Sequence, residues 1–189
     1  MDGFDMSSWE APKEKQGGKN ANGTLPFELL RELKVGTTVL RILDDRPIWR
    51  YQHFDGTQAL LVCEGEAKDC LFCERQYGRQ PSHFGFMNVL DKTDGRVKTG
   101  RFSQNLFKKL KPFVATYGDP RRYDVGITRT GLKRDTDYTI VKGDNQSPVE
   151  PDVMAQRYDL EKLLTPMSKQ AQQQYLGGAS SNGKDDLGK

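Results

Sequence analysis

Apolar and polar residues alternate in several short segments of this chain, which predicts a structure built mainly from β-strands. The first of them, TTVLRIL, begins at Thr37 and ends at Leu43, directly before Asp44 and Asp45. Asp94-Gly95 is typical of a tight hairpin turn, because glycine accepts a positive φ, so the segments on either side of it are expected to pair. The predicted strands cover 37–43, 48–54, 59–63, 83–90, 96–102, 123–130 and 137–141.

The segment that begins at Ser103 has the period of an amphipathic helix instead. Ser103 can cap the first turn, Gly118 can end the helix, and Pro112 predicts a kink within it. The apolar positions that share one face of this helix are Leu106, Phe107, Leu110, Phe113, Val114 and Tyr117. Two further helices are expected at about 160–164 and 166–175, where they close the ordered part of the chain.

At least five short strands with one helix inserted before the last pair favour a small closed barrel. The OB-fold, a five-stranded Greek-key barrel, is the barrel of this size that binds oligonucleotides. The predicted fold is therefore mainly β with accessory helices, as an OB-fold core over 25–176. Residues 1–24 and 177–189 are rich in Gly, Ser, Asn and Lys without periodicity, and are expected to form a flexible arm and a flexible tail.

Three cysteines and one histidine lie close together in the run HFDGTQALLVCEGEAKDCLFC, and the chain has no other cysteine. Their spacing is His53-x9-Cys63-x6-Cys70-x2-Cys73, and the last pair has the gap of a zinc knuckle. Zinc held by three thiolates and one imidazole is tetrahedral and closed, so the expected role is in folding. The sequence predicts one structural Zn²⁺ in a subdomain at 53–73; the alternative is three unrelated buried thiols.

His83 is the competing fourth ligand, ten positions after Cys73. It begins an alternating strand, where a ring facing the domain is an ordinary structural feature, so we favour His53. An enzyme is a further alternative, because nucleobase deaminases also hold zinc with His and Cys-x2-Cys, in the signature H-x-E followed by P-C-x-x-C. Here Asp69 precedes Cys70 and no Glu follows His53 at the required distance, so no enzymatic activity is predicted.

Positive charge is concentrated in the middle of the chain. Residues 92–142 hold 13 Lys and Arg against five Asp, a net charge of +8 in a chain whose total is +3. Such a block is typical of proteins that bind polyanions, although it also suits a solvated surface rich in Lys. No apolar run approaches the roughly 20 residues of a membrane span, and an odd cysteine count without a signal peptide argues against a secreted disulfide protein.

Aromatic residues alternate with cations on the predicted strands, for example at Trp49, Arg50 and Tyr51. Exposed rings can stack on unpaired bases while Lys and Arg hold phosphates, and neither contact requires a particular base sequence. Phe86 and Tyr123 are expected in the core instead. The residues predicted to contact nucleic acid are Arg41, Trp49, Arg50, Tyr51, Phe84, Lys98, Arg101, Phe102, Lys108, Lys109, Lys111, Arg121, Arg122, Arg129, Lys133 and Arg134.

Several runs resemble phage single-stranded-DNA-binding proteins of the T-even helix-destabilising, gene 32 protein-like type. The resemblance rests on LKVGTTVLRILDD, WRYQH, the set of His53 and three cysteines, FGFMNVLD and YGDPRRYDVGITRTG, and covers about residues 30–165. It implies an OB-fold with a zinc subdomain that coats single-stranded DNA during phage replication, recombination and repair. It also implies the bacterial host cytoplasm as location, and phage polymerase, helicase or helicase loader as partners. A zinc-containing RNA-binding or transcription-regulating module is the alternative.

Overall fold

The structure is a computed structural model of the 189-residue chain. It describes residues 28–30, 33–55, 60–63, 65, 69–76, 79–132, 135–144 and 147–181. The predicted arm at 1–24 and residues 182–189 of the predicted tail lie outside the described residues. The contacts divide the chain into two compact units. We call the described parts of Pro26–Trp49 and His83–Leu160 the sheet unit, and those of Arg50–Ser82 and Glu161–Lys189 the knuckle unit.

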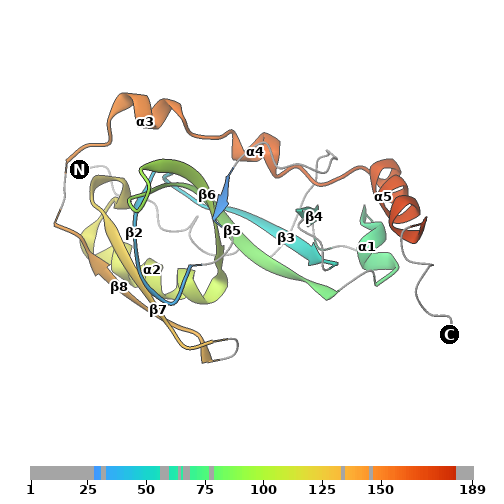
Figure 1. The fold of residues 1–189 in the computed structure, drawn as a ribbon, viewed down its shortest axis with the longest axis horizontal. Coiled ribbons are helices and arrows are strands. Elements are labelled where there is room, and N and C mark those ends of the chain that lie inside the picture. Colours follow the sequence, from blue (N-terminus) through green and yellow to red (C-terminus); the bar gives the residue numbers. More distant parts are fainter. Residues whose placement is uncertain are drawn as a thin grey trace. The chain divides into compact units, whose positions relative to one another are not determined.

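Eight strands form one mixed sheet, as predicted for a mainly β protein (Figure 1). The strands are β1 (Leu29–Leu30), β2 (Gly36–Ile42), β3 (Ile48–Phe54), β4 (Leu61–Cys63), β5 (Arg79–Asp91), β6 (Arg96–Ser103), β7 (Val125–Thr130) and β8 (Asp137–Lys142). Their order is β1-β6-β5-β2-β7-β8, and β3 pairs with β4 and β5. β1 runs parallel to β6, whereas β2, β5, β6, β7 and β8 pair antiparallel along this order.

The closed Greek-key barrel is not confirmed, because the sheet is open. Among the described strands, no pairing joins β1 at one end of the order to β8 at the other. β6 pairs with β5 on one side and, at Thr99 and Gly100, with the short β1 on the other. The alternating sequence pattern therefore predicted seven of the eight described strands, but neither the short β1 nor the way in which the sheet ends.

Helix α2 (Gln104–Tyr117) covers the core of the sheet unit, and its predicted ends are confirmed. The Ser103 hydroxyl accepts a hydrogen bond from the Leu106 amide at 3.4 Å, which is an N-terminal cap. Gly118, at φ 77°, donates its amide to the Val114 carbonyl at 2.8 Å. Pro112 lies within the helix. The buried positions Leu106, Phe107, Leu110 and Val114 pack on the strands, and Phe86 and Tyr123 are buried as predicted.

Four short helical segments and one longer helix complete the described chain. They are α1 (Leu71–Glu74), a 3₁₀ turn (Pro120–Arg122), α3 (Pro151–Ala155), α4 (Leu160–Leu163) and α5 (Lys169–Ser181). α4 and α5 correspond to the predicted closing helices, but α5 begins later than expected and continues into the segment predicted as a flexible tail. The knuckle, predicted as a loop, contains the single turn α1, whose first residues follow Cys70.

Candidate metal centre and nucleic-acid interface

The predicted metal ligands come from three elements of the knuckle unit. His53 lies near the end of β3, Cys63 ends β4, Cys70 precedes α1 and Cys73 lies within α1. In the antiparallel pairing of β3 with β4, His53 is opposite Leu61 and Tyr51 is opposite Cys63. His53 and Cys63 are therefore diagonal neighbours on one face of the pair. The turn of α1 then brings both remaining thiols to the same side.

The four ligand atoms converge on one point. His53 Nε2 lies 3.2 Å from Cys73 Sγ, 3.3 Å from Cys63 Sγ and 3.6 Å from Cys70 Sγ. The sulfurs of Cys63 and Cys73 are 3.8 Å apart, and all four atoms lie within 4.8 Å of one another. A tetrahedral zinc site with Zn–S of about 2.3 Å has S···S edges of about 3.8 Å and N···S edges of about 3.6 Å. The group therefore fits a metal ion of this kind.

The group is also closed to solvent. His53, Cys63 and Cys70 are each 1% exposed, and Cys73 is half-buried.

The structure does not place His83 in this group. The centroid of its ring lies 5.1 Å from that of Trp49, and its Nδ1 lies 3.2 Å from Gln104 Nε2. Burial lowers the pKa of His83, as expected for a ring held within the sheet unit.

Three thiols so close together favour a cation among them. The pKa of Cys63 is raised, mainly by its hydrogen bond to Cys70, and that same bond lowers the pKa of Cys70 to about 4. Burial raises the pKa of Cys73 to about 11. The negative charge of one thiolate thus makes the neighbouring thiols harder to deprotonate, and a bound cation offsets this repulsion.

Three cations predicted to hold phosphates are buried, two of them in ion pairs and one in hydrogen bonds. Arg41 is 3% exposed, and its Nε donates to Asp124 Oδ1 at 2.7 Å. Lys98 is 7% exposed and lies 2.8 Å from Asp91 Oδ2 and 2.6 Å from Asp94 Oδ2. Arg129 is buried and donates to the Leu33 carbonyl at 2.8 Å. The three side chains thus lie inside the sheet unit instead of facing solvent, which is not the position expected of a phosphate contact.

Two predicted base-stacking rings belong to the core. Trp49 is 8% exposed and packs against Phe107, with ring centroids 4.7 Å apart. Phe102 is 3% exposed and lies in the same cluster, where its ring occupies the space that a side chain at Gly100 would need. Both rings are enclosed by other side chains of the core, which is not the position expected of a ring that stacks on a base.

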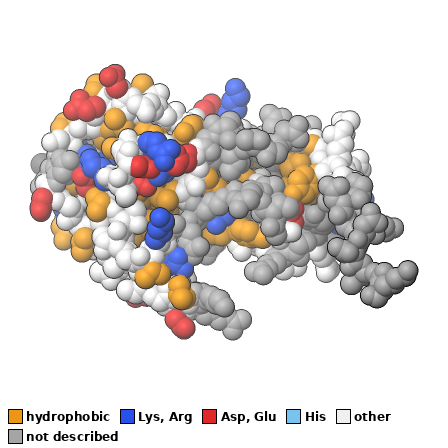
Figure 2. All heavy atoms as spheres, in the orientation of Figure 1, with side chains coloured by type: hydrophobic (Ala, Val, Ile, Leu, Met, Phe, Trp, Pro, Cys, Tyr) orange, Lys and Arg blue, Asp and Glu red, His pale blue; other side chains and the backbone are white. Residues whose placement is uncertain are grey.

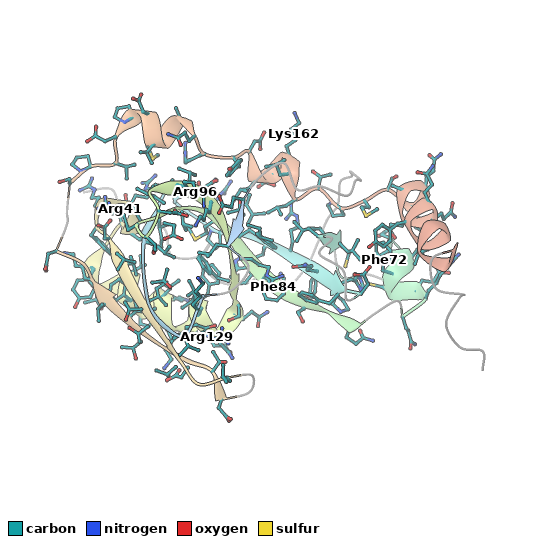
Figure 3. The ribbon with its side chains drawn as sticks, viewed as in Figure 1. Arg41, Phe72, Phe84, Arg96, Arg129 and Lys162 are labelled. Atoms are coloured by element: carbon teal, nitrogen blue, oxygen red, sulfur yellow. The ribbon has the colours of Figure 1, made fainter. Side chains whose placement is uncertain are left out.

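Phe84 and Arg101 are both predicted to contact nucleic acid, and in the structure they lie next to each other at the surface. Both side chains are half-buried, on the paired strands β5 and β6, and Figure 3 labels Phe84. The Arg101 guanidinium carbon lies 4.8 Å from the centroid of the Phe84 ring. This is a cation–π pair, which positions the ring and the charge side by side. Arg101 is three residues before α2, so the pair lies at the N-terminal end of that helix.

The remaining candidates are divided between the two units. On α2, Lys108 and Lys109 are exposed and Lys111 is half-buried; Lys109 lies 3.2 Å from Asp137. Arg121 pairs with Asp119 at 2.8 Å, and Arg122 is exposed.

In the knuckle unit, Arg50 donates a hydrogen bond to the Leu164 carbonyl at 3.1 Å, and Tyr51 packs against the cluster that contains Cys63 and Cys70. Lys133 and Arg134 lie outside the described residues. On the face drawn in Figure 2, cations lie beside carboxylates instead of forming an unbroken basic patch.

Sequence reasoning missed a second ring–cation cluster, at the C-terminal end of α2. Tyr117 is 49% exposed and packs on Phe113 at 4.8 Å. Lys142 Nζ lies 5.5 Å from the Tyr117 ring and 5.1 Å from the ring of buried Tyr123. Lys109, Phe113 and Tyr117 are spaced four apart, which places them on one side of the helix. That spacing could have predicted this cluster from the sequence. Phe113 and Tyr117 were assigned to the apolar face of the helix instead, because they also fit its period.

The chain was compared with protein-family models, with curated protein sequences and with solved structures, and none of them matches. Among the described residues, no helix has the length and apolar character needed to cross a membrane. The geometry of the metal-ligand group and of the ring–cation contacts is therefore the basis for assigning a function.

Proposed function

We propose that this chain binds single-stranded DNA without sequence specificity. The observation that carries the proposal is the pair of ring–cation contacts at the two ends of α2, Phe84 with Arg101 and Tyr117 with Lys142. A helix of 14 residues spans roughly 21 Å at 1.5 Å per residue, so the two contacts are separated by a distance that several nucleotides can follow. Rings of this kind stack on unpaired bases, whose faces are enclosed in a duplex.

Cations along α2 support the same proposal. Lys108, Lys109 and Lys111 lie between the two ring–cation contacts along the helix. The pair of Lys109 with Asp137 is exposed on both sides, and such pairs contribute little, so a phosphate can replace the carboxylate at small cost. Phosphate contacts of this type supply affinity but carry no base-sequence information.

We further infer that His53, Cys63, Cys70 and Cys73 hold one structural Zn²⁺. The match of their separations to a tetrahedral site supports this assignment. Four protein ligands leave no position for a water nucleophile, so the metal contributes to folding and the chain is proposed to have no enzymatic activity.

The sequence resemblance extends the proposal to a biological setting. A phage helix-destabilising protein would coat single-stranded DNA in the cytoplasm of a bacterial host and contact the phage polymerase, helicase or helicase loader. An OB-fold is a partly open barrel, and strands arranged around one inserted helix are compatible with it. The runs on both sides of the metal ligands, on which the resemblance rests, support this extension.

A competition experiment tests the function. The zinc-loaded full chain is titrated against a fluorescent oligothymidylate, and unlabelled single-stranded DNA, duplex DNA and RNA of equal length compete for it. Single-stranded DNA should compete best, and log affinity should fall linearly with log salt, by about 0.7 per phosphate contacted. Equal competition by duplex DNA, or an affinity that does not change with salt, would refute the proposal. Stronger competition by RNA would favour the RNA-binding alternative.

A further inference from the structure

One side of α5 contacts the segment that carries two of the metal ligands (Figure 1). Gln172 is 1% exposed, and its side-chain Oε1 accepts a hydrogen bond from the Leu71 amide at 2.6 Å. Its Nε2 donates to the Met167 carbonyl at 2.7 Å. Both polar ends of this buried amide are therefore used, and one of them fixes the backbone directly after Cys70.

Tyr175, one turn later on α5, contacts both ligand-bearing segments. Its hydroxyl donates to Asp55 Oδ2 at 2.6 Å, two residues after His53. Its ring meets the Phe72 ring edge-on, with centroids 5.9 Å apart. Phe72 is fully buried and lies in the sequence between Cys70 and Cys73; its ring centroid is 5.6 Å from that of His53. Gln172 and Tyr175 thus connect the end of β3 with α1.

The remaining exposed and buried positions of α5 agree with this contact surface. Apart from Gln172, the polar residues at the neighbouring positions 170, 173 and 174 are exposed. Tyr175 and Leu176 pack against a cluster whose buried members are Leu61, Cys63, Cys70 and Phe72. Two of these four side chains are metal ligands, so the surface beneath α5 depends on the ligands being held together.

We propose that Gln172 and Tyr175 are positioning residues for the metal centre, and that the metal in turn holds α5 in place. This inference rests on the zinc site proposed above. Groups that orient metal ligands commonly change metal affinity by about 10–100-fold when they are removed. Coupling between two binding events is reciprocal, so a helix that strengthens metal binding is itself held more firmly when the metal is bound.

The chain offers a matched pair of variants for the test. Gln172→Ala removes the hydrogen bond to Leu71, whereas Gln173→Ala changes the same residue type at the exposed neighbouring position. Zinc-loaded full chains are mixed with a colorimetric chelator, and the affinity for zinc is derived by competition. Gln172→Ala should bind zinc about 10–100-fold more weakly than the wild type, and Gln173→Ala should match the wild type. Equal zinc affinity in both variants would overturn the proposal.

A spectroscopic measurement separates positioning from a general loss of stability. In the cobalt-substituted protein, Gln172→Ala and Tyr175→Phe should each shift the visible cobalt bands, which report ligand geometry. A spectrum unchanged in both variants would overturn the positioning role, even if the variants unfold at a lower temperature.

In the wild type, chelation should increase hydrogen exchange at the amides of 169–181. Unchanged protection there would overturn the proposal that the metal holds α5 in place. A wild-type chain that binds neither zinc nor cobalt would overturn the metal centre itself, a result distinguishable from the others.

Discussion

The two units of this protein are stabilised in different ways. The sheet unit has a cluster of 14 buried apolar residues, drawn from strands and from α2. The knuckle unit has a cluster of only four buried residues, and two of them are cysteines. Burial of a large apolar side chain contributes about 1.5–3 kcal/mol, so the first unit gains far more from apolar burial than the second. The cluster of the second unit buries fewer apolar side chains, so we expect the metal proposed above to contribute much of its folding free energy.

Loss of the metal should have the largest effect, and only on the knuckle unit. Cys70→Ser removes one of four ligands, and zinc binding in small structural sites contributes on the order of 10 kcal/mol to folding. Hydrogen exchange should rise steeply at the described amides of 50–76 and 161–181 and change little in β7 and β8. Equal loss of protection in both units would show that they are not stabilised separately.

Trp49 should matter for stability rather than for DNA binding. Trp49→Ala leaves a cavity beside Phe107, so the free energy of unfolding should fall by about 3–5 kcal/mol. Trp49→Phe retains a ring and should cost less. Urea denaturation measures the change, and the zinc content should stay that of the wild type. A Trp49→Ala variant of normal stability that binds single-stranded DNA weakly would restore the ring to the binding surface.

The local features of both units could be predicted from the sequence, because they depend on neighbouring residues. The ligand spacing gave the metal group, β3 has the predicted bounds, and Ser103 and Gly118 begin and end α2 as expected. Each of these follows from short-range geometry. A Cys-x2-Cys turn, an N-terminal cap and a strand of alternating residues require no knowledge of distant contacts.

The side of the sheet that each charged or aromatic residue faces could not be predicted in the same way. Arg41 and Asp124 are 83 positions apart, and Gln172 reaches Leu71 across 101 positions. In a strand of alternating type, the pattern shows that neighbours point to opposite faces but not which face is covered by a helix. The position of Trp49 against Phe107 of α2 is an example, since that contact exists only after the sheet and the helix pack.

The partly exposed rings should affect binding more than stability. Phe84→Ala and Tyr117→Ala should each weaken binding to single-stranded DNA by about 1–3 kcal/mol, the usual contribution of a stacked base. Fluorescence anisotropy measures the affinity, and zinc content should be unchanged. If both variants bind as tightly as the wild type, base stacking on these rings does not contribute to the affinity, and only the phosphate contacts of the proposed function remain.

Replacing an exposed lysine on α2 should alter the salt dependence by one phosphate contact. Lys108→Ala should reduce the slope of log affinity against log salt by about 0.7. Lys169→Ala, an exposed lysine at the start of α5 in the knuckle unit, is the matched control and should leave the slope unchanged. A similar reduction in both variants would mean that net charge matters but not the position of the lysine.

Acid should weaken the sheet unit slightly through the hairpin of β5 and β6. A hydrogen bond from Lys98 lowers the pKa of Asp94 to about 2. Burial opposes a similar shift at Asp91, but hydrogen bonds from Lys98 and Thr93 still lower the pKa of that carboxyl. Because a lowered carboxyl pKa stabilises the folded state above the unfolded value, this stability should be lost as the pH falls from about 4 to 2. Asp94→Asn should flatten the stability profile over that range, measured by urea denaturation at successive pH values.

The metal content of the purified chain tests the central claim most directly. Native mass spectrometry of the wild type should show one zinc ion per chain, held by His53, Cys63, Cys70 and Cys73. His83→Ala should keep the ion, since the structure places His83 against Trp49 in the sheet unit, whereas His53→Ala should lose it. A metal-free wild-type chain with a normally protected knuckle unit, or loss of zinc from His83→Ala with retention in His53→Ala, would contradict the account.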